Sequence, residues 1–125
     1  MKKIVLIEDD PSNAKLMMKI LRSDGYEVTH AENATTGLQM AQDQRPNLIL
    51  LDFGLPDLDG TTVAKMLKHL AYTRHIPILA VTGNTSSATQ RLAIANGCEE
   101  VIFKPYDTRS LRKKVADYLG VPAPV

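Results

Sequence analysis

Leu48-Ile49-Leu50-Leu51 is followed directly by Asp52, which places a carboxylate at the end of a continuous apolar run. Four apolar residues are too few for a helix, and the run lacks the alternation of a strand with one exposed face. Such a run is typical of a strand in a parallel sheet that is covered on both sides. We therefore expect residues 48–51 to form a core strand and Asp52 to lie at the carboxyl edge of the sheet.

Four more strands are expected along the chain. Three are strong apolar runs, at Ile4–Ile7, Ile78–Val81 and Val101–Phe103, whereas Tyr26–His30 alternates apolar and polar residues and is placed at an edge. Between the strands, apolar residues recur at helical spacing. The predicted inner helix faces are Ala14, Met17, Met18 and Leu21; Ala34, Leu38 and Ala41; Val63, Leu67 and Leu70; Ala88, Leu92 and Ala95; and Leu111, Val115 and Leu119.

The pattern is therefore a βα unit repeated five times. Asp10 before Pro11 is typical of a helix N-cap, and Gly25, Gly97 and Gly120 stand where helices should end in a left-handed residue. Short right-handed crossovers leave one economical arrangement. We predict an α/β, flavodoxin-like three-layer sandwich, (βα)5, with parallel sheet order 2-1-3-4-5.

The composition sets limits on the class of protein. A chain of 125 residues predicts one domain over residues 1–120, followed by a flexible tail over residues 121–125. A formal net charge of +1 gives no indication of nucleic acid or a membrane surface as a partner. Cys98 is the only cysteine, and the apolar run at residues 4–7 is too short for a signal peptide. We expect a cytoplasmic protein without a membrane segment.

Chemically active side chains follow four of the five strands. Glu8 and Asp9 follow the first, Asp52 the third, Thr82 the fourth and Lys104 the fifth. Because the carboxyl ends of parallel strands meet at one edge, these groups should converge. Crowded carboxylates repel one another unless a cation separates them, and Mg²⁺ prefers oxygen ligands with only one or two carboxylates. We predict a Mg²⁺ site, with Asp52 as a nucleophile towards phosphorus and the Lys104 ammonium neutralising the phosphoryl charge.

With these motifs the chain resembles the response-regulator receiver domains of two-component signalling over nearly its whole length. The motifs are Glu8-Asp9, the segment Leu51–Gly60, Thr82-Gly83 and Lys104-Pro105. The resemblance implies that Asp52 accepts a phosphoryl group from a sensor histidine kinase or a histidine phosphotransfer protein. It also implies that Glu8, Asp9, Asp52 and the backbone carbonyl of Gly54 hold Mg²⁺, with Lys104 and Thr82 on the phosphoryl oxygens, and that the peptide bond before Pro105 is cis.

By the same resemblance, the protein is a stand-alone phospho-acceptor switch rather than a turnover enzyme. Mg²⁺-dependent self-phosphorylation and self-dephosphorylation would accompany that role. A downstream protein would read the switch at the face formed by the fourth and fifth helices, whose basic residues include Arg109, Arg112, Lys113 and Lys114. The same bases are also explained by an ordinary solvated helix face.

Two features of the motifs depart from the usual pattern. Val101 stands where the family commonly has Tyr or Phe, and a valine cannot make the inward swing that couples such an aromatic to the threonine. Tyr106 could act on the same surface but is better interpreted as a partly buried loop aromatic. Gly54 has no side chain to orient water, from which we expect slow or partner-dependent loss of phosphate; Asn84 is a second position where the family tunes this rate.

Other functions remain open at this point. Thr82-Gly83-Asn84-Thr85 is similar to a flavodoxin phosphate loop, which would indicate an FMN-binding protein, although this loop follows the fourth strand rather than the first. A phosphatase using an aspartyl-phosphate would need a second acid where Gly54 stands. A phosphorelay intermediate, or a receiver segment of a hybrid kinase, is the remaining alternative within signalling.

Overall fold

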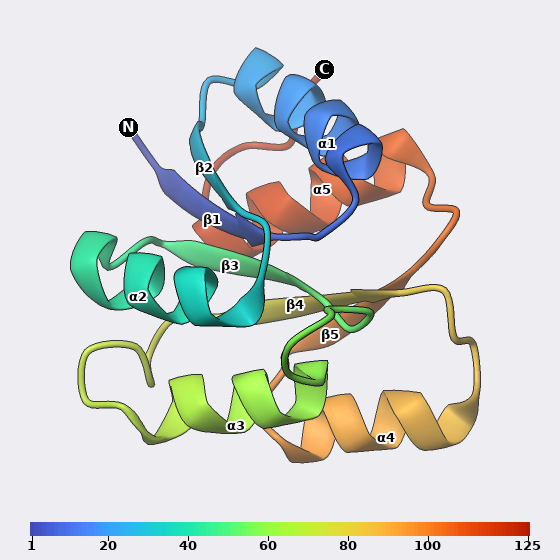
Figure 1. The fold of residues 1–125 in the computed structure, drawn as a ribbon. Coiled ribbons are helices and arrows are strands. Elements are labelled where there is room, and N and C mark those ends of the chain that lie inside the picture. Colours follow the sequence, from blue (N-terminus) through green and yellow to red (C-terminus); the bar gives the residue numbers. More distant parts are fainter.

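The computed structural model describes residues 1–125 as five strands alternating with five helices (Figure 1). The strands are β1 (Lys3–Ile7), β2 (Glu27–Ala31), β3 (Leu48–Asp52), β4 (Ile78–Thr82) and β5 (Glu100–Phe103). The helices are α1 (Pro11–Ser23), α2 (Ala34–Gln44), α3 (Gly60–His69), α4 (Ser87–Ala95) and α5 (Thr108–Leu119). All neighbouring strands are parallel, in the order β2-β1-β3-β4-β5. The predicted fold class and sheet order are confirmed.

The sheet is the middle layer of a sandwich. Helices α2, α3 and α4 cover one face, and α1 and α5 cover the other (Figure 1). On β3, Ile49 and Leu51 face the first group of helices, whereas Leu48 and Leu50 face the second. Every residue of β3 is buried. This two-sided burial is the physical reason for the unbroken apolar run from which the fold was predicted.

Four of the five predicted helix faces are largely buried, and the α4 face is wrong. Leu92 is 54% exposed, Ala88 and Ala95 are also exposed, and Ala93 is the residue of α4 that is buried against the sheet. The mistake has a simple cause, because alanine packs almost as readily outside as inside and gives a weak periodic signal. Leu92 instead faces a groove beside the carboxyl edge.

Local details follow the sequence closely. The weak strand begins one residue later than predicted and lies at an edge, as expected. Asp10 caps α1 by accepting hydrogen bonds from the N–H groups of Ser12 and Asn13 at 2.8 and 3.3 Å. Gly25, Gly97 and Gly120 all have positive φ.

The first residue of the predicted tail, Val121, contacts the folded domain. Val121 donates its N–H to the Ala116 carbonyl at 3.1 Å and packs against the core beneath α1 and α5. Flexibility of residues 121–125 stays a prediction. None of the helices is long and apolar enough to cross a membrane.

Candidate functional site

The carboxyl ends of β1 and β3 bring three acids together. These strands are paired, with Ile7 opposite Leu51, so the residues that follow Ile7 lie beside Asp52. Glu8, Asp9 and Asp52 each offer a carboxylate oxygen, and these oxygens lie within 4.8 Å of one another. Glu8 and Asp52 are only 3% and 5% exposed, whereas Asp9 is open to solvent. The sequence prediction that these acids converge is confirmed by this geometry.

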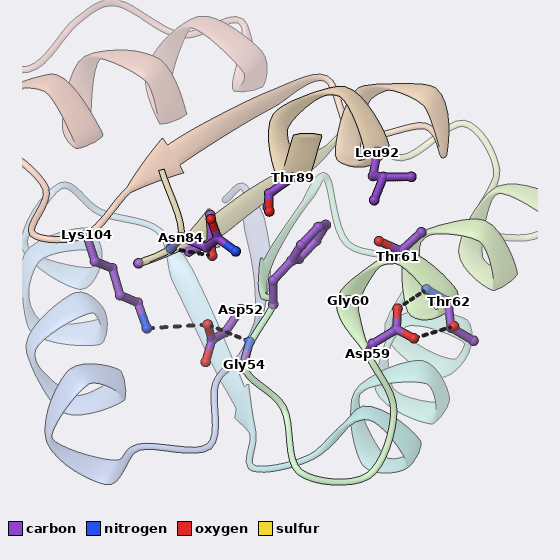
Figure 2. Close-up of a pocket in the computed structure, with 13 residues that line it drawn as sticks. Asp52, Gly54, Asp59, Gly60, Thr61, Thr62, Asn84, Thr89, Leu92 and Lys104 are labelled. Atoms are coloured by element: carbon purple, nitrogen blue, oxygen red, sulfur yellow. Dashed lines mark hydrogen bonds and ion pairs between the residues drawn. The ribbon is translucent and has the colours of Figure 1, made fainter. Parts of the chain in front are cut away.

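Lys104 reaches the acids from the end of β5. Its Nζ lies 3.0 Å from Glu8 Oε1 and 3.3 Å from Asp52 Oδ1, and Figure 2 shows it directed at Asp52. The Lys104 N–H also donates to the Thr82 carbonyl at 2.8 Å, which joins β5 to β4 at the site. The Lys104-Pro105 peptide bond is cis, as the resemblance implies. One ammonium is therefore shared between two buried carboxylates.

The two buried acids have opposite pKa shifts. Burial raises the pKa of Glu8 to about 7, helped by its hydrogen bond to Asp52 and only partly offset by Lys104. Burial alone would also raise the pKa of Asp52, but hydrogen bonds from Glu8 and the Gly54 N–H, together with Lys104, hold it below its usual value. Glu8 therefore takes the proton first, and Asp52 stays ionised. An ionised, desolvated carboxylate is suited to nucleophilic attack.

Lys104 is itself tuned by this environment. Its partial burial would lower the pKa, but the hydrogen bond to Glu8 and the charge of Asp52 outweigh that effect and raise it. The side chain is thus a permanent cation at physiological pH. It supplies positive charge beside Asp52 whatever the protonation state of Glu8.

Thr82 closes the side of the site formed by β4. It is 6% exposed, and its Oγ1 accepts a hydrogen bond from the Asn84 N–H at 3.1 Å. The hydroxyl hydrogen can still be donated to a ligand. Next to it, Gly83 leaves open space, since a Cβ there would meet no atom within 4 Å.

A groove of about 850 Å³ runs from Asp52 to the first turns of α3 and α4. Thr61 on α3 lies on one side, and Thr89 and Leu92 on α4 lie on the other (Figure 2). Lys104 and Thr82 line the same groove near Asp52. A group attached to Asp52 would therefore stand at the open mouth of a polar groove rather than in a closed cavity.

The donors available at this edge fit a hard cation. Every candidate ligand is an oxygen, and the three carboxylates lie at the carboxyl ends of two adjacent strands, β1 and β3. Mg²⁺ prefers such a set, completed by water and substrate oxygens. Gly54, two residues after Asp52, donates its N–H to Asp52 Oδ1 at 3.1 Å. Its carbonyl is the fourth predicted ligand. The residues present therefore fit the predicted ion.

The departures noted in the sequence have structural counterparts. Val101 is 5% exposed in the core on the α2–α4 side of the sheet. Phe103, two residues further along the same strand, packs against that core and lies in register with Thr82. Tyr106 is half-buried against the opposite core, which agrees with its interpretation as a partly buried loop aromatic.

Sequence reasoning missed two side chains near the site. His30 on β2 has Nε2 at 2.7 Å from the Glu8 carbonyl oxygen, so it supports the backbone of a candidate ligand. Asp57, in the loop after β3, accepts hydrogen bonds from the start of α2. Each of these two side chains is more than twenty residues from its hydrogen-bond partner in sequence, and no local pattern indicates such a contact. The only available signal was an acid directly after Pro56.

The basic residues of α5 are largely engaged within the protein. Arg112 forms a bidentate pair with Asp24 at the end of α1, with its shortest contact at 2.7 Å. Lys113 and Lys114 pair with Asp117 and Glu100. This pairing favours the structural explanation of these bases over a dedicated partner surface.

Comparisons with known proteins agree with this geometry. The chain matches the response regulator receiver domain family over residues 4–116, and it belongs to that family. It is 34% identical over 119 residues to the polar-differentiation response regulator DivK of Brucella anthropi, covering 95% of this chain and 97% of that protein. A CheY-like receiver domain from Methanospirillum hungatei superposes with a TM-score of 0.90 at 30% identity, covering 96% of this chain and 94% of that one.

A second solved relative contains the ion that the donor set fits. The receiver domain of a sensor histidine kinase from Pseudomonas aeruginosa, with magnesium coordinated in its active-site cleft, superposes with a TM-score of 0.88 at 29% identity. The match covers 95% of this chain and 98% of that one. Membership of the receiver family decides against the flavodoxin-like alternative.

Proposed function

We propose that this receiver domain accepts a phosphoryl group on Asp52 from the phosphohistidine of a sensor histidine kinase or a phosphotransfer protein. Glu8, Asp9, Asp52 and the Gly54 carbonyl would hold Mg²⁺ during the reaction. The observation that carries the proposal is the convergence of three carboxylates, within 4.8 Å, with the Lys104 ammonium. Two of the three carboxylates are buried, and crowded acids repel one another unless a cation offsets their charge.

The transfer uses groups that are already in position. An oxygen of Asp52 forms a bond to phosphorus while the bond between phosphorus and the histidine nitrogen breaks, and that nitrogen retains the electron pair. The bound ion would neutralise charge on the phosphoryl oxygens. Lys104, 3.3 Å from Asp52 Oδ1, provides a second positive charge, and the Thr82 hydroxyl can donate to a phosphoryl oxygen.

The phosphorylated state would be read through the loop after β4 and through α4. Recruitment of Thr82 towards Asp52 would break its hydrogen bond with Asn84 and so change the start of the loop that leads to α4. Leu92 and Ile94, 54% and 47% exposed on α4, offer apolar surface to a downstream protein. The paired bases of α5 support placing this contact chiefly on α4 within the predicted α4–α5 face.

The acyl phosphate would be lost slowly by self-dephosphorylation. Gly54 carries no side chain, and a Cβ at that position would still lie 3.6 Å from Asp52 Oδ2. No side chain at residue 54 can therefore hold a water molecule for attack on phosphorus. Rapid hydrolysis of the purified phosphoprotein in Mg²⁺ would contradict this expectation.

A phosphorelay intermediate is the second candidate, favoured by one observation. Val101 is buried and short, so it cannot make the large inward movement available to an aromatic side chain. A relay needs no state-dependent partner. Binding assays with the phosphoprotein, the unmodified protein and Asp52→Asn distinguish the two, because only a switch requires a partner that prefers the phosphorylated form.

Acetyl phosphate provides a direct test of the phospho-acceptor proposal. Incubation with acetyl phosphate and Mg²⁺, followed by intact mass measurement, should show one added phosphoryl group on the wild type and none on Asp52→Asn. Chelation of the metal should abolish the adduct. The same adduct on both proteins would show that Asp52 is not the acceptor.

A further inference from the structure

We propose that Asp57 is a positioning residue for the magnesium site, because its carboxylate ties the loop that follows Asp52 to the first turn of α2. The inference rests on the proposed function. The loop spans residues 53–59, between β3 and α3, and contains Gly54. The side-chain hydrogen bonds of Asp57 go to Ala34 and Thr35, not to the acids, so it acts through the backbone of this loop.

The tie consists of three hydrogen bonds to two residues. Asp57 Oδ1 accepts from the Ala34 N–H at 2.9 Å, and Oδ2 accepts from the Thr35 N–H and hydroxyl, both at 3.1 Å. These N–H groups are the first two of α2 and have no partner within the helix. The carboxylate also lies at the positive end of the helix dipole. In agreement, the Ala34 N–H heads the contacts that lower the pKa of Asp57.

Helix α2 is a rigid anchor for this loop. Gly37 approaches β1 so closely that a Cβ there would lie 2.5 Å from Ile7 Cδ1, and Ala34 and Ala41 are fully buried. Ile7 is the last residue of β1 and directly precedes Glu8. The helix held by Asp57 is thus packed on the strand that presents the first two acids.

The hydrogen bonds between Asp57 and α2 link the part of the site that follows β1 to the part that follows β3. Glu8 and Asp9 directly follow β1, whereas Asp52 is the last residue of β3 and Gly54 lies in the loop after it. The far end of the loop is fixed by Asp59, which caps α3 by accepting from the Thr62 N–H at 2.9 Å. Gly54 is exposed and lies between the end of β3 and Asp57. Asp57 therefore fixes the position of the Gly54 carbonyl relative to the acids that follow β1.

A matched variant separates this role from simple stabilisation of α2. Asn33 caps the same helix by accepting from the Thr36 N–H at 2.9 Å, but this hydrogen bond stays within the helix's own segment and does not involve the loop. Asn33→Ala and Asp57→Ala each remove capping contacts from α2. Only Asp57→Ala releases the loop.

Calorimetric titration with Mg²⁺ measures the effect on the site. Relative to the wild type, we expect Asp57→Ala to weaken Mg²⁺ binding about tenfold, as for the loss of groups that orient metal ligands. Asp57→Asn keeps one acceptor oxygen and should give an intermediate loss. Asn33→Ala should bind Mg²⁺ as the wild type does. Equal affinities for Asp57→Ala and the wild type, or equal losses in Asp57→Ala and Asn33→Ala, would overturn the proposal.

Amide hydrogen exchange of the metal-free protein tests the same idea without the ion. The Gly54 amide should exchange several-fold faster in Asp57→Ala than in both the wild type and Asn33→Ala. Unchanged exchange at Gly54 would refute the positioning role. A wild type that binds no Mg²⁺ and accepts no phosphoryl group would instead refute the proposed function, while the exchange comparison still decides the role of Asp57.

Discussion

Removing one charge from the acidic cluster should stabilise the metal-free protein. We choose Asp9→Asn, which keeps the shape of the side chain but removes its charge. At 4.8 Å, the upper limit of the separations between these oxygens, two unit charges repel by about 1 kcal/mol at the dielectric of water and by about 3.5 kcal/mol at an effective dielectric of 20. Asp9 is exposed, so the lower value applies. For 125 residues, a gain of about 1 kcal/mol raises the Tm by about 4 °C.

Thermal melting in low salt with a chelator, and then in Mg²⁺, measures both consequences. The wild type should gain stability as Mg²⁺ is added, by about 2.7 kcal/mol at one hundred times its Kd. Metal-free Asp9→Asn should have a higher Tm than the metal-free wild type, and its stability should increase much less when Mg²⁺ is added.

Asp10→Asn is the matched control for this experiment. It removes a neighbouring charge but keeps the oxygen that caps α1, and asparagine caps a helix about as well as aspartate. Its Tm and its Mg²⁺ response should both resemble those of the wild type. A metal-free Asp9→Asn that melts below the wild type, or that keeps the full Mg²⁺ response, would refute the reasoning about crowded charge.

Three further predictions concern the pH dependence of stability, the packing at two glycines and the reactivity of the cysteine. Because burial, with the hydrogen bond to Asp52, raises the pKa of Glu8 to about 7 from its usual 4.5, the native state binds that proton more tightly than the unfolded chain. The unfolding free energy of the metal-free protein should therefore fall as pH rises from about 4.5 to 7, and denaturant titrations of Glu8→Gln should lack that decline. Gly37→Ala should cost about 1 to 2 kcal/mol by crowding the β1 core, net of the helix propensity gained, whereas Gly83→Ala, with open space, should leave the Tm unchanged. Burial raises the pKa of Cys98 to about 12, so a thiol reagent at pH 8 should label it only after unfolding; rapid labelling of the native protein would contradict this.

The main elements could be predicted because their signals are local. Asp52 ends an apolar run that only a strand covered on both faces requires, and the carboxyl-edge rule then brings it near Asp9 and Lys104. The burial of α4 could not be predicted in this way. Its alanines carry little preference for either face, and Leu92 turned towards the groove beside the site.

The contacts that position the site are harder to predict because they join distant parts of the chain. Asp57 reaches a helix start 23 residues earlier, and the acid looks like an ordinary loop residue in sequence. Lys104 is 96 residues from Glu8, and the family resemblance indicates their proximity without indicating that one ammonium serves two carboxylates. The opposite pKa shifts of Glu8 and Asp52 depend on burial and mutual distances, which only the folded arrangement provides.

Mapping the phosphoryl group to a residue is the decisive measurement for Asp52 as the acceptor. After reaction with acetyl phosphate and Mg²⁺, borohydride reduction converts an aspartyl phosphate to homoserine, which peptide mass spectrometry can locate. We expect this conversion at Asp52 alone, and its loss when the metal is chelated. Conversion at Asp9 or Asp57, or conversion at Asp52 that proceeds equally well without the metal, would contradict it.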